Sequence, residues 1–329
     1  MINPDIPVTD VKGLSLFKNN TVVDIYGLIK ELNSRYTASG KPYVDIVLSD
    51  KGGTVDVKIW DATGEELPAN TGDAVKIRGA VGEWNSKPQL TVKYDRTANP
   101  FLRKIDFNVD EVKEDDLIAC APISGQELWQ RLKTMVDDFE NHELKAIILK
   151  FLTQYEQELL YYPGGESVHH AVKSGLLYHI YGMVIMGEGS AAFYGLDKEL
   201  LISGAIIHDI GKLKEYQSNE NGIVLDRSVD GQLLGHMIIG VDMLDELACG
   251  VDISPECLML LKHMIISHHY DETWGAYQKP MFPEAELLHH LDLMDSRMNI
   301  MMSYYENLQA GEFSEKNYWL GRRAYKPKL

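Results

Sequence analysis

The spacing of apolar residues changes once along this chain of 329 residues, and the change divides it into two parts. Before residue 105, apolar and polar residues alternate, as through residues 54–60, and a period of two is typical of half-buried strands. After Ser124, apolar residues recur at intervals of three and four, which is typical of helices with one buried face. The second spacing is clearest at Leu128, Leu132, Met135 and Val136. We therefore expect a multidomain protein, all-β first and all-α afterwards.

The first part contains five short segments with the spacing of strands. They cover residues 21–32, 43–48, 54–60, 74–81 and 89–94. Five strands of this length predict a small barrel. The layout resembles the OB-fold, a five-stranded barrel that binds oligonucleotides through its second and third strands and the adjoining loops.

Aromatic and basic residues share the predicted outer face of this barrel. If the branched residues point inward, then Tyr43, Lys58 and Trp60 point outward. Rings can stack on bases and lysines can neutralise phosphates, so this face is a candidate surface for single-stranded nucleic acid. The alternative is a surface that contacts protein, because barrels of this type also bind proteins. The adjoining loops add candidates of the same two kinds, which are Tyr36, Lys41, Trp84 and Lys87.

An acidic connector separates the two parts. Residues 106–123 are rich in Asp and Glu and suit a linker, which places the predicted domains at 1–105 and 124–329. The net charge of −17 argues against a protein that coats nucleic acid, since phosphate binding needs Lys and Arg. Residues 1–105 are close to neutral, however, so a narrow binding channel in the barrel remains compatible with this charge.

The sequence carries no sign of a membrane or secreted protein. No apolar run approaches the roughly 20 residues that span a bilayer, and the N-terminus lacks the features of a signal peptide. Cys120, Cys249 and Cys257 are too few and too irregularly spaced for a disulfide framework or a thiolate zinc site. We therefore expect a cytoplasmic location and no membrane partner.

Histidines gather in the second part, where ten of the eleven lie between residues 169 and 290. Several of these histidines, together with two aspartates, form a series whose successive members are separated by about the length of one helix and its connection. Each member can therefore point inward from a different helix. Imidazoles and carboxylates together are the usual ligands of divalent cations, and a shared cation offsets the cost of burying them. The series consists of His179, His208-Asp209, His236, His268-His269 and Asp292.

This order resembles the HD superfamily of metal-dependent phosphohydrolases. With the preceding barrel, nearly the whole chain resembles the YhaM family of 3′→5′ exoribonucleases. The matching segments are His169-His170-Ala171, Gly175-Leu176-Leu177-Tyr178-His179, His208-Asp209-Ile210-Gly211-Lys212, Leu234-Gly235-His236, Ser267-His268-His269, Glu286-Leu287-Leu288-His289 and Asp292-Leu293-Met294-Asp295.

The resemblance implies a set of metal ligands. His179, His208, Asp209 and Asp292 would hold one cation, and His236 with either His268 or His269 would hold a second, with Asp209 as the bridge. The resemblance implies Mn²⁺. Independently, mixed nitrogen and carboxylate ligands suit Mn²⁺, Fe²⁺ or Zn²⁺ better than Mg²⁺, which prefers oxygen ligands.

Other residues near the series are candidates for contact with substrate. Lys212, four positions after His208, could face the same cavity and neutralise a phosphate oxygen, which would make Asp209 and Lys212 the catalytic pair; the alternative is a solvated lysine at a helix end. For Asp295 a helix cap or surface carboxylate is the alternative. The further candidates for substrate contact are His169, His170, Asp295 and Arg297.

The hypothesis that follows is a metal-dependent phosphodiesterase, a 3′→5′ exonuclease that degrades single-stranded RNA and, by extension, single-stranded DNA. The polarity and the RNA preference are implied by the resemblance alone. One alternative is a phosphohydrolase acting on small nucleotides. Another is a nucleic-acid-binding barrel with a vestigial helical domain, which is weakened because every expected ligand position is filled. A homo-oligomer is compatible with the sequence, but no motif specifies it.

Overall fold

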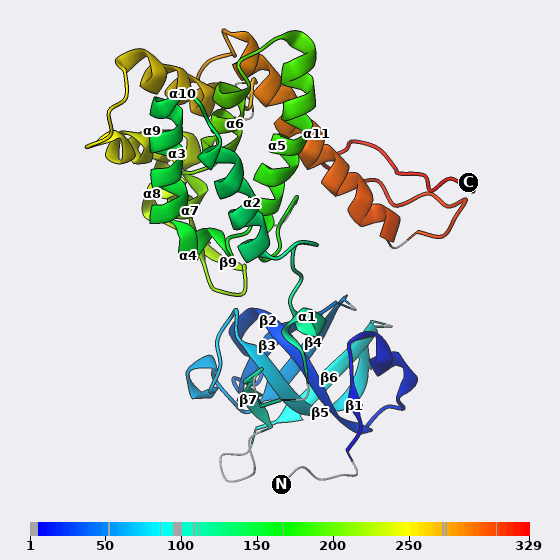
Figure 1. Cartoon of the computed structure of the whole chain (residues 1–329). Coiled ribbons are helices and arrows are strands. Elements are labelled where there is room, and N and C mark those ends of the chain that lie inside the picture. Colours follow the sequence, from blue (N-terminus) through cyan, green and yellow to red (C-terminus); the bar gives the residue numbers. More distant parts are fainter. Residues whose placement is uncertain are drawn as a thin grey trace. The chain divides into compact units, whose positions relative to one another are not determined.

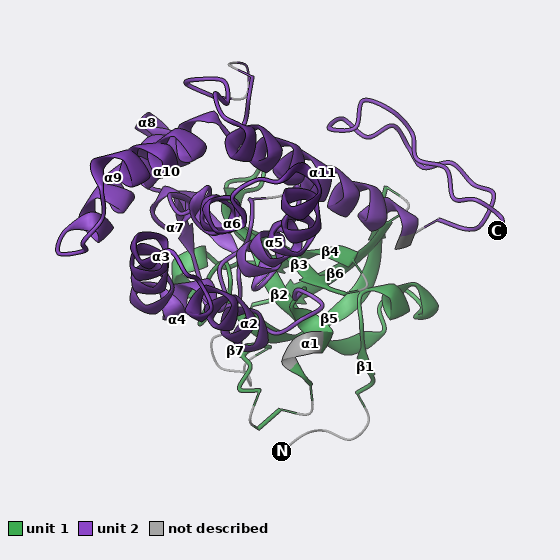
Figure 2. Ribbon diagram, turned by 45° about the horizontal axis from the view of Figure 1, so that its top comes forward, with its two compact units in different colours: residues 1–119 green, residues 120–329 purple. Residues whose placement is uncertain are grey.

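The computed structural model describes the chain except residues 1–5, 52, 86, 95–100, 108, 111, 167, 272, 274 and 307. The described residues form two compact units, Met1–Ala119 and Cys120–Leu329 (Figure 2). Each unit has its own hydrophobic core. Among the described residues, no helix is long and apolar enough to cross a membrane.

The first unit is a closed barrel (Figure 1). Neighbouring strands follow the order β2-β3-β4-β6-β5, and β5 pairs back onto β2 to close the ring. β4 and β6 pair in parallel, whereas the other neighbours in the ring are antiparallel. This is the OB-fold topology, so the predicted barrel is confirmed. The elements are β1 (Val8–Thr9), η1 (Lys12–Leu16), β2 (Val22–Tyr36), β3 (Pro42–Asp50), β4 (Gly53–Trp60), η2 (Gly64–Glu66), β5 (Ala74–Trp84), β6 (Lys87–Lys93) and β7 (Leu102–Lys104).

The long strand β2 closes the barrel because it bends. A bulge between Ile29 and Glu31 interrupts its pairing with β3, and residues 22–28 pair with β5, so that Leu28 pairs with both neighbours. A bulge increases the local bend and twist of a strand, which lets one strand serve two neighbours. Alternate residues of the strands fill the interior, as the period-two pattern predicts, and on β3 and β4 these are Val44, Ile46, Leu48, Val55, Val57 and Ile59.

The acidic connector is largely counted with the barrel unit, because the division between the units falls after Ala119. Within it, Asp110 accepts hydrogen bonds from the Arg103 guanidinium at the end of the barrel. Leu117, at the end of α1 (Glu114–Leu117), and Ile118 are buried. The domain limits at 105 and 124 remain a prediction.

The second unit is a helical bundle built around α6 (Lys198–Ile207). Every residue of α6 from Leu200 onward is buried, and α3, α5, α10 and α11 all contact this helix. The all-α prediction omitted a small hairpin, β8–β9, because strands of three and four mostly polar residues leave no periodic signal. The other elements are α2 (Gly125–Asp137), α3 (His142–Gln154), α4 (Glu156–Leu159), α5 (Gly175–Tyr194), α7 (Lys212–Glu215), β8 (Tyr216–Ser218), β9 (Val224–Arg227), α8 (Val229–Leu233), α9 (Gly235–Ala248), α10 (Pro255–Ser267) and α11 (Pro283–Glu306).

Candidate metal centre

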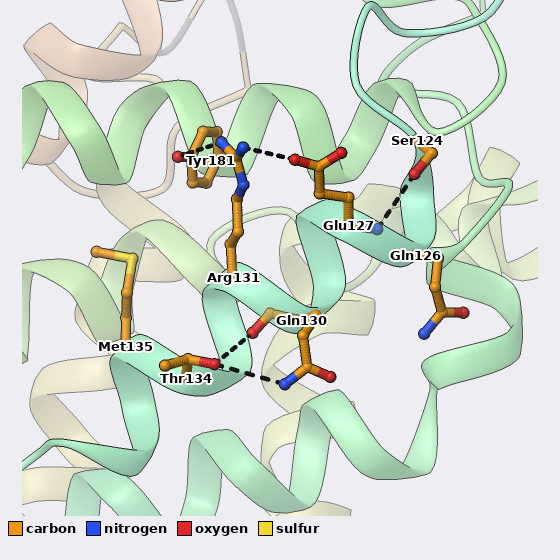
Figure 3. Close-up of a pocket in the computed structure, with 8 residues that line it drawn as sticks. All are labelled: Ser124, Gln126, Glu127, Gln130, Arg131, Thr134, Met135 and Tyr181. Atoms are coloured by element: carbon orange, nitrogen blue, oxygen red, sulfur yellow. Dashed lines mark hydrogen bonds and ion pairs between the residues drawn. The ribbon is translucent and has the colours of Figure 1, made fainter.

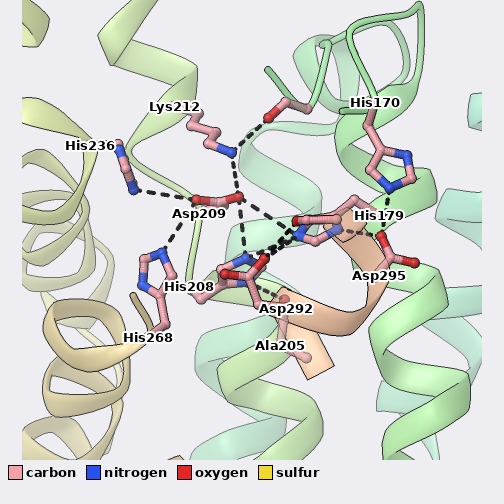
Figure 4. A network of polar contacts seen from close by, with 12 residues as sticks. His170, His179, Ala205, His208, Asp209, Lys212, His236, His268, Asp292 and Asp295 are labelled. Carbon is pink, nitrogen blue, oxygen red and sulfur yellow. Dashed lines mark hydrogen bonds and ion pairs between the residues drawn. The ribbon is translucent and has the colours of Figure 1, made fainter. Parts of the chain in front are cut away.

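Residues from five different helices or helix ends meet at one buried point of the bundle (Figure 4). His179 lies on α5 and Asp292 on α11, while His236 lies in the first turn of α9. Two further histidines occupy the positions directly after α6 and α10, where the chain leaves the helix. These are His208, which is followed by Asp209, and His268, which is followed by His269.

Four imidazoles are oriented in the same way. The Nδ1 atoms of His208 and His268 donate to the carbonyl oxygens of Ala205, at 2.9 Å, and Ile265, at 2.7 Å. Nδ1 of His179 lies 2.7 Å from Asp295 Oδ2, whereas Nδ1 of His236 makes only an ion-pair contact, at 3.3 Å, with Glu215 Oε2, which has no hydrogen bond among the described residues. An acceptor at Nδ1 selects the tautomer whose Nε2 carries a free lone pair. The rings of His179, His208 and His268 therefore present a ligand nitrogen to the centre, and Nε2 of His236 faces Asp209 Oδ1 at 3.6 Å.

On one side of Asp209, four side chains form the first cluster (Figure 4). His179 Nε2 lies 3.3 Å from both His208 Nε2 and Asp292 Oδ1. Asp209 Oδ2 lies 3.2 Å from His208 Nε2 and 4.0 Å from His179 Nε2. Two ring nitrogens and two carboxylate oxygens facing one another at these distances match the donor set of a divalent cation.

On the other side of Asp209, three imidazoles form the second cluster. Asp209 Oδ1 lies 3.6 Å from His236 Nε2 and 3.8 Å from His268 Nε2. All three atoms are buried, and among the described residues none has a hydrogen-bond partner. His269 joins this group, with a ligand atom within 4.8 Å of those of His236 and His268. Buried polar atoms without partners are costly, so this cluster also fits a cation.

The electrostatics of the clusters agree with cation binding. Burial alone would raise the pKa of Asp209, but Lys212, His208 and His236 outweigh it and hold this pKa well below its usual range. Burial, reinforced by the neighbouring histidines, lowers the pKa of His268 far below normal, so this ring is neutral. Burial also lowers the pKa of His179, but its two carboxylate neighbours prevail and raise it to about 9. A cation bound there must displace that proton.

Lys212 faces the metal centre. It does not, however, lie one turn further along the helix that precedes His208. The chain turns at Gly211, where an added Cβ would lie 1.8 Å from the His236 carbonyl oxygen, and Lys212 begins α7. Its Nζ is buried between Asp209 Oδ2, at 2.7 Å, and the Gly164 carbonyl oxygen, at 2.6 Å. The alternative of a solvated lysine is therefore wrong.

The structure brings three of the four further candidates to the centre. Asp295 Oδ2 lies 2.6 Å from His170 Nε2 as well as 2.7 Å from His179 Nδ1, so it connects these two rings. His169 lies beside them, with its ring 6.1 Å from that of His179, and burial lowers its pKa to about 3. Arg297 is exposed on α11, and no contact between described residues joins it to the clusters.

The barrel candidates form two groups at opposite ends of β4. Tyr43 and Trp60 are cross-strand partners whose rings lie 5.1 Å apart, and Tyr36 and Lys41 lie at the same end. Lys58 lies over the Tyr43 ring but is ion-paired with Asp45, which also binds Arg35. Trp84 pairs with Lys87 across β5 and β6, beside the start of β4. The predicted outer face is thus confirmed, while its binding role stays a prediction.

Comparison with known proteins identifies the family to which the chain belongs. An HD domain model matches residues 176–297, which include both clusters. The 3′-5′ exoribonuclease YhaM of Oceanobacillus iheyensis is 33% identical over 308 residues, which cover 92% of this chain and 93% of the relative. This chain belongs to the YhaM family. The YhaM of Bacillus subtilis is also 33% identical, over 96% of this chain and 98% of its own length. An OB domain from Thermoplasma acidophilum has 14% identity and a TM-score of 0.25, over 32% of this chain and 93% of that structure.

Sequence reasoning missed several supports of the centre in this YhaM-family chain. Glu215 is buried beside His236, and its other oxygen, Oε1, lies 3.4 Å from Arg227 Nη1. Asn299 Oδ1 accepts from the backbone N–H of His170 at 3.0 Å. Glu215 lies between Lys214 and Tyr216 in a largely polar segment, so its local sequence offered no signal. The contacts of Gly164 and Asn299 join distant parts of the chain and leave no signal in the local sequence.

We expect Glu215 to control the second cluster selectively. Glu215→Gln removes the charge that faces His236 Nδ1, and the affinity of a cation held by His236 should fall about 10- to 100-fold. Calorimetric titration with Mn²⁺ should show one binding event weakened and the other unchanged. The matched control is Glu166→Gln, because Glu166 binds Arg227 but has no described contact with His236. Equal weakening of both events would contradict a selective role.

A separate hollow lies on the surface of α2 and α5 (Figure 3). Within it, the Arg131 guanidinium donates to Tyr181 Oη at 2.9 Å and pairs with Glu127, so its charge is already balanced. None of the predicted site residues contributes to it. Its lining consists of Ser124, Gln126, Glu127, Gln130, Arg131, Thr134, Met135 and Tyr181.

Proposed function

We propose that this chain is a metal-dependent 3′→5′ exoribonuclease that hydrolyses single-stranded RNA at the buried histidine–aspartate centre. Two findings support the proposal: the near full-length similarity to proteins named 3′-5′ exoribonuclease YhaM, and the HD domain match. One observation carries it. Four imidazoles from different helices direct Nε2 toward the two oxygens of Asp209, and three of these buried atoms have no hydrogen-bond partner among the described residues.

The ligand sets follow from the distances. We assign the first cation to His179, His208, Asp292 and Asp209 Oδ2, and the second to His236, His268, His269 and Asp209 Oδ1. Asp209 would thus contribute one oxygen to each position. A set this rich in nitrogen favours Mn²⁺, Fe²⁺ or Zn²⁺ over Mg²⁺, and among these we propose Mn²⁺.

The chemistry divides between the cations and the side chains. Divalent cations in such a site acidify water and polarise a phosphodiester, which is what hydrolysis requires. Lys212 holds Asp209 ionised and orients it, and its described partners use two of its three N–H groups. The third can donate to a phosphate oxygen as negative charge grows in the transition state. Asp295 keeps the His179 ring turned so that Nε2 faces the first cluster.

The barrel supplies the second half of the proposal. Tyr43, Trp60 and the lysines near them offer stacking faces and positive charge along β3 and β4. Stacking accepts any base and does not read the 2′-hydroxyl, so single-stranded DNA should bind this face as well as RNA. Specificity for RNA, where it exists, then depends on residues at the metal centre.

A time course with end-labelled RNA tests this function. Single-stranded RNA labelled at its 5′ end should shorten gradually in the presence of Mn²⁺, because nucleotides leave from the 3′ end while the label stays on the shrinking strand. A chelator should stop the reaction. Immediate release of a labelled mononucleotide would contradict the polarity. Hydrolysis of free nucleotides without shortening of RNA would instead support a small-nucleotide phosphohydrolase.

A further inference from the structure

Helix α11 has two distinct faces. Asp292, Asp295 and Asn299 point toward the metal centre and its supports. On an adjacent face, three methionines follow one another at intervals of four residues and are about half exposed, and Met298 retains 54% of its accessible surface. A stripe at this spacing is the form in which a helix packs against another helix. The stripe consists of Met294, Met298 and Met302.

Residues 308–329, here called the C-terminal arm, extend beyond the end of α11, away from the other helices (Figures 1 and 2). The arm forms a hairpin in which Phe313 pairs with Tyr325, and Leu320 and Ala324 are buried. Tyr305 Oη donates to the Tyr325 carbonyl oxygen at 2.8 Å, which fastens the arm to α11. The arm therefore has its own structure, although an isolated two-stranded hairpin is only marginally stable in water.

The outer surface of the arm is both apolar and basic. Tyr318 is 86% exposed and Trp319 is 59% exposed, and Phe313 and Tyr325 are exposed as well. Together with the methionine stripe, these side chains make an exposed apolar surface of the kind that marks an interface. The arm contains five basic and two acidic residues, in a chain whose net charge is −17. A basic arm on an acidic protein is complementary to the rest of that same protein.

We propose that this surface binds a second copy of the chain. Two α11 helices pack antiparallel around a two-fold axis near Met298, so that the methionine stripes cover each other and each arm lies on the other copy. An interface with two-fold symmetry uses the same surface twice, which a stripe centred on one residue satisfies. Thioether side chains adapt well to such contacts.

The far end of α11 supplies a matching surface for the arm. There, Glu284 accepts a hydrogen bond from the Asp197 backbone N–H at 2.9 Å, so the corner between α5 and α6 lies beside it. This corner exposes Phe193, at 81%, and Tyr194. Glu188, on the last turns of α5, is ion-paired with Lys198, and Asp197 and Glu284 leave this corner with a net negative charge. In the antiparallel pair the basic, aromatic arm of one copy reaches the acidic, aromatic corner of the other.

The lengths agree with this arrangement. Glu284 lies 14 positions before Met298, or about 21 Å along the helix, and the arm begins about 15 Å beyond Met298. A 22-residue arm folded into a hairpin spans the difference easily. A single-stranded nucleic acid would match the arm's cations and rings but not the methionine stripe, which offers neither charge nor a stacking face. A second copy of the chain matches both the arm and the methionine stripe. This proposal does not depend on the metal chemistry.

Sedimentation velocity of the full chain from about 0.1 to about 50 µM tests the proposal, and we expect a dimer across much of this range. Met298→Glu places like charges face to face at the axis and should raise the dissociation constant at least about 100-fold. Trp319→Ala should raise it about tenfold or more. The matched control is Leu233→Glu, a more exposed apolar residue on α8, which should leave the dimer intact. Circular dichroism confirms that each variant is folded.

A cross-link provides a second measurement that does not depend on a destabilising charge. Met298→Cys should form a covalent dimer on mild oxidation because the two thiols meet at the axis, whereas the native chain, with exposed Cys249, should not. A native chain that stays monomeric throughout, or a Met298→Glu variant that associates like Leu233→Glu, overturns the proposal. So does a monomer in which Trp319→Ala weakens retention of labelled RNA, since the arm would then bind nucleic acid.

Discussion

Asp209→Asn should lower the turnover of single-stranded RNA at least about 10³-fold, the largest effect that we expect from any single substitution. Asp209 faces both clusters, with Oδ2 toward His208 and Oδ1 toward His236, so one change weakens both cation positions. RNA should still be retained, because the stacking residues of the barrel are untouched. Steady-state degradation of labelled RNA and filter retention of the same RNA measure the two properties.

Two further variants separate a loss of catalysis from a loss of stability. Asp209→Asn leaves the buried Lys212 without its carboxylate partner, so a drop in stability could imitate a catalytic effect. Asp292→Asn removes a carboxylate of the first cluster alone and keeps the Asp209–Lys212 pair, and it should also abolish turnover. Asp242→Asn, on the exposed side of α9, should behave as the unaltered chain. If Asp209→Asn kept full turnover, the metal centre as described would be wrong.

The combined variant Tyr43→Ala and Trp60→Ala should raise the KM for long single-stranded RNA about 10- to 100-fold, since each stacked base contributes about 1–3 kcal/mol. Hydrolysis of a small chromogenic phosphodiester should hardly change, because this substrate needs only the metal centre. The ratio of kcat/KM for the two substrates is therefore the informative measurement. Leu16→Ala, on the exposed surface of η1, is the matched control.

The two substrates also distinguish the roles of the barrel. Equal losses on RNA and on the chromogenic substrate would mean that the aromatic pair supports the structure rather than binding the strand. An unchanged KM for RNA would mean that the strand binds to another surface of the protein. Trp84→Ala, at the opposite end of β4, should produce a smaller increase in KM if the strand crosses the whole face.

Both the barrel and the ligand order could be predicted from local patterns. Alternation is strong on β3 and β4 because each inward residue is completely or almost completely buried and each outward one except Ser49 meets solvent. The spacing of the histidine and aspartate series predicted separate helices, and each member does lie on or directly after a different one. The hairpin β8–β9 was missed because its strands are too short to show a period.

Other features of the centre depend on contacts between distant segments. Nothing near Lys212 in the sequence indicates that the Gly164 carbonyl oxygen accepts from it, and nothing near His236 indicates how Glu215 is turned. The choice between His268 and His269 could not be made from two adjacent letters. Packing at the end of α10 buries His268 with Nε2 toward Asp209, while His269 joins the same cluster from the next position.

The sequence by itself determined the two architectures, the kind of chemistry and the side chains able to perform it, because periodicity and residue type act locally. Tertiary structure alone decided which atom of each imidazole faces the centre, how Asp209 is shared between two clusters, and which face of α11 stays uncovered. These features depend on the relative orientation of segments that lie far apart in the chain. The hydrogen bonds made by Nδ1 fix the orientations of the imidazole rings only after the helices have packed.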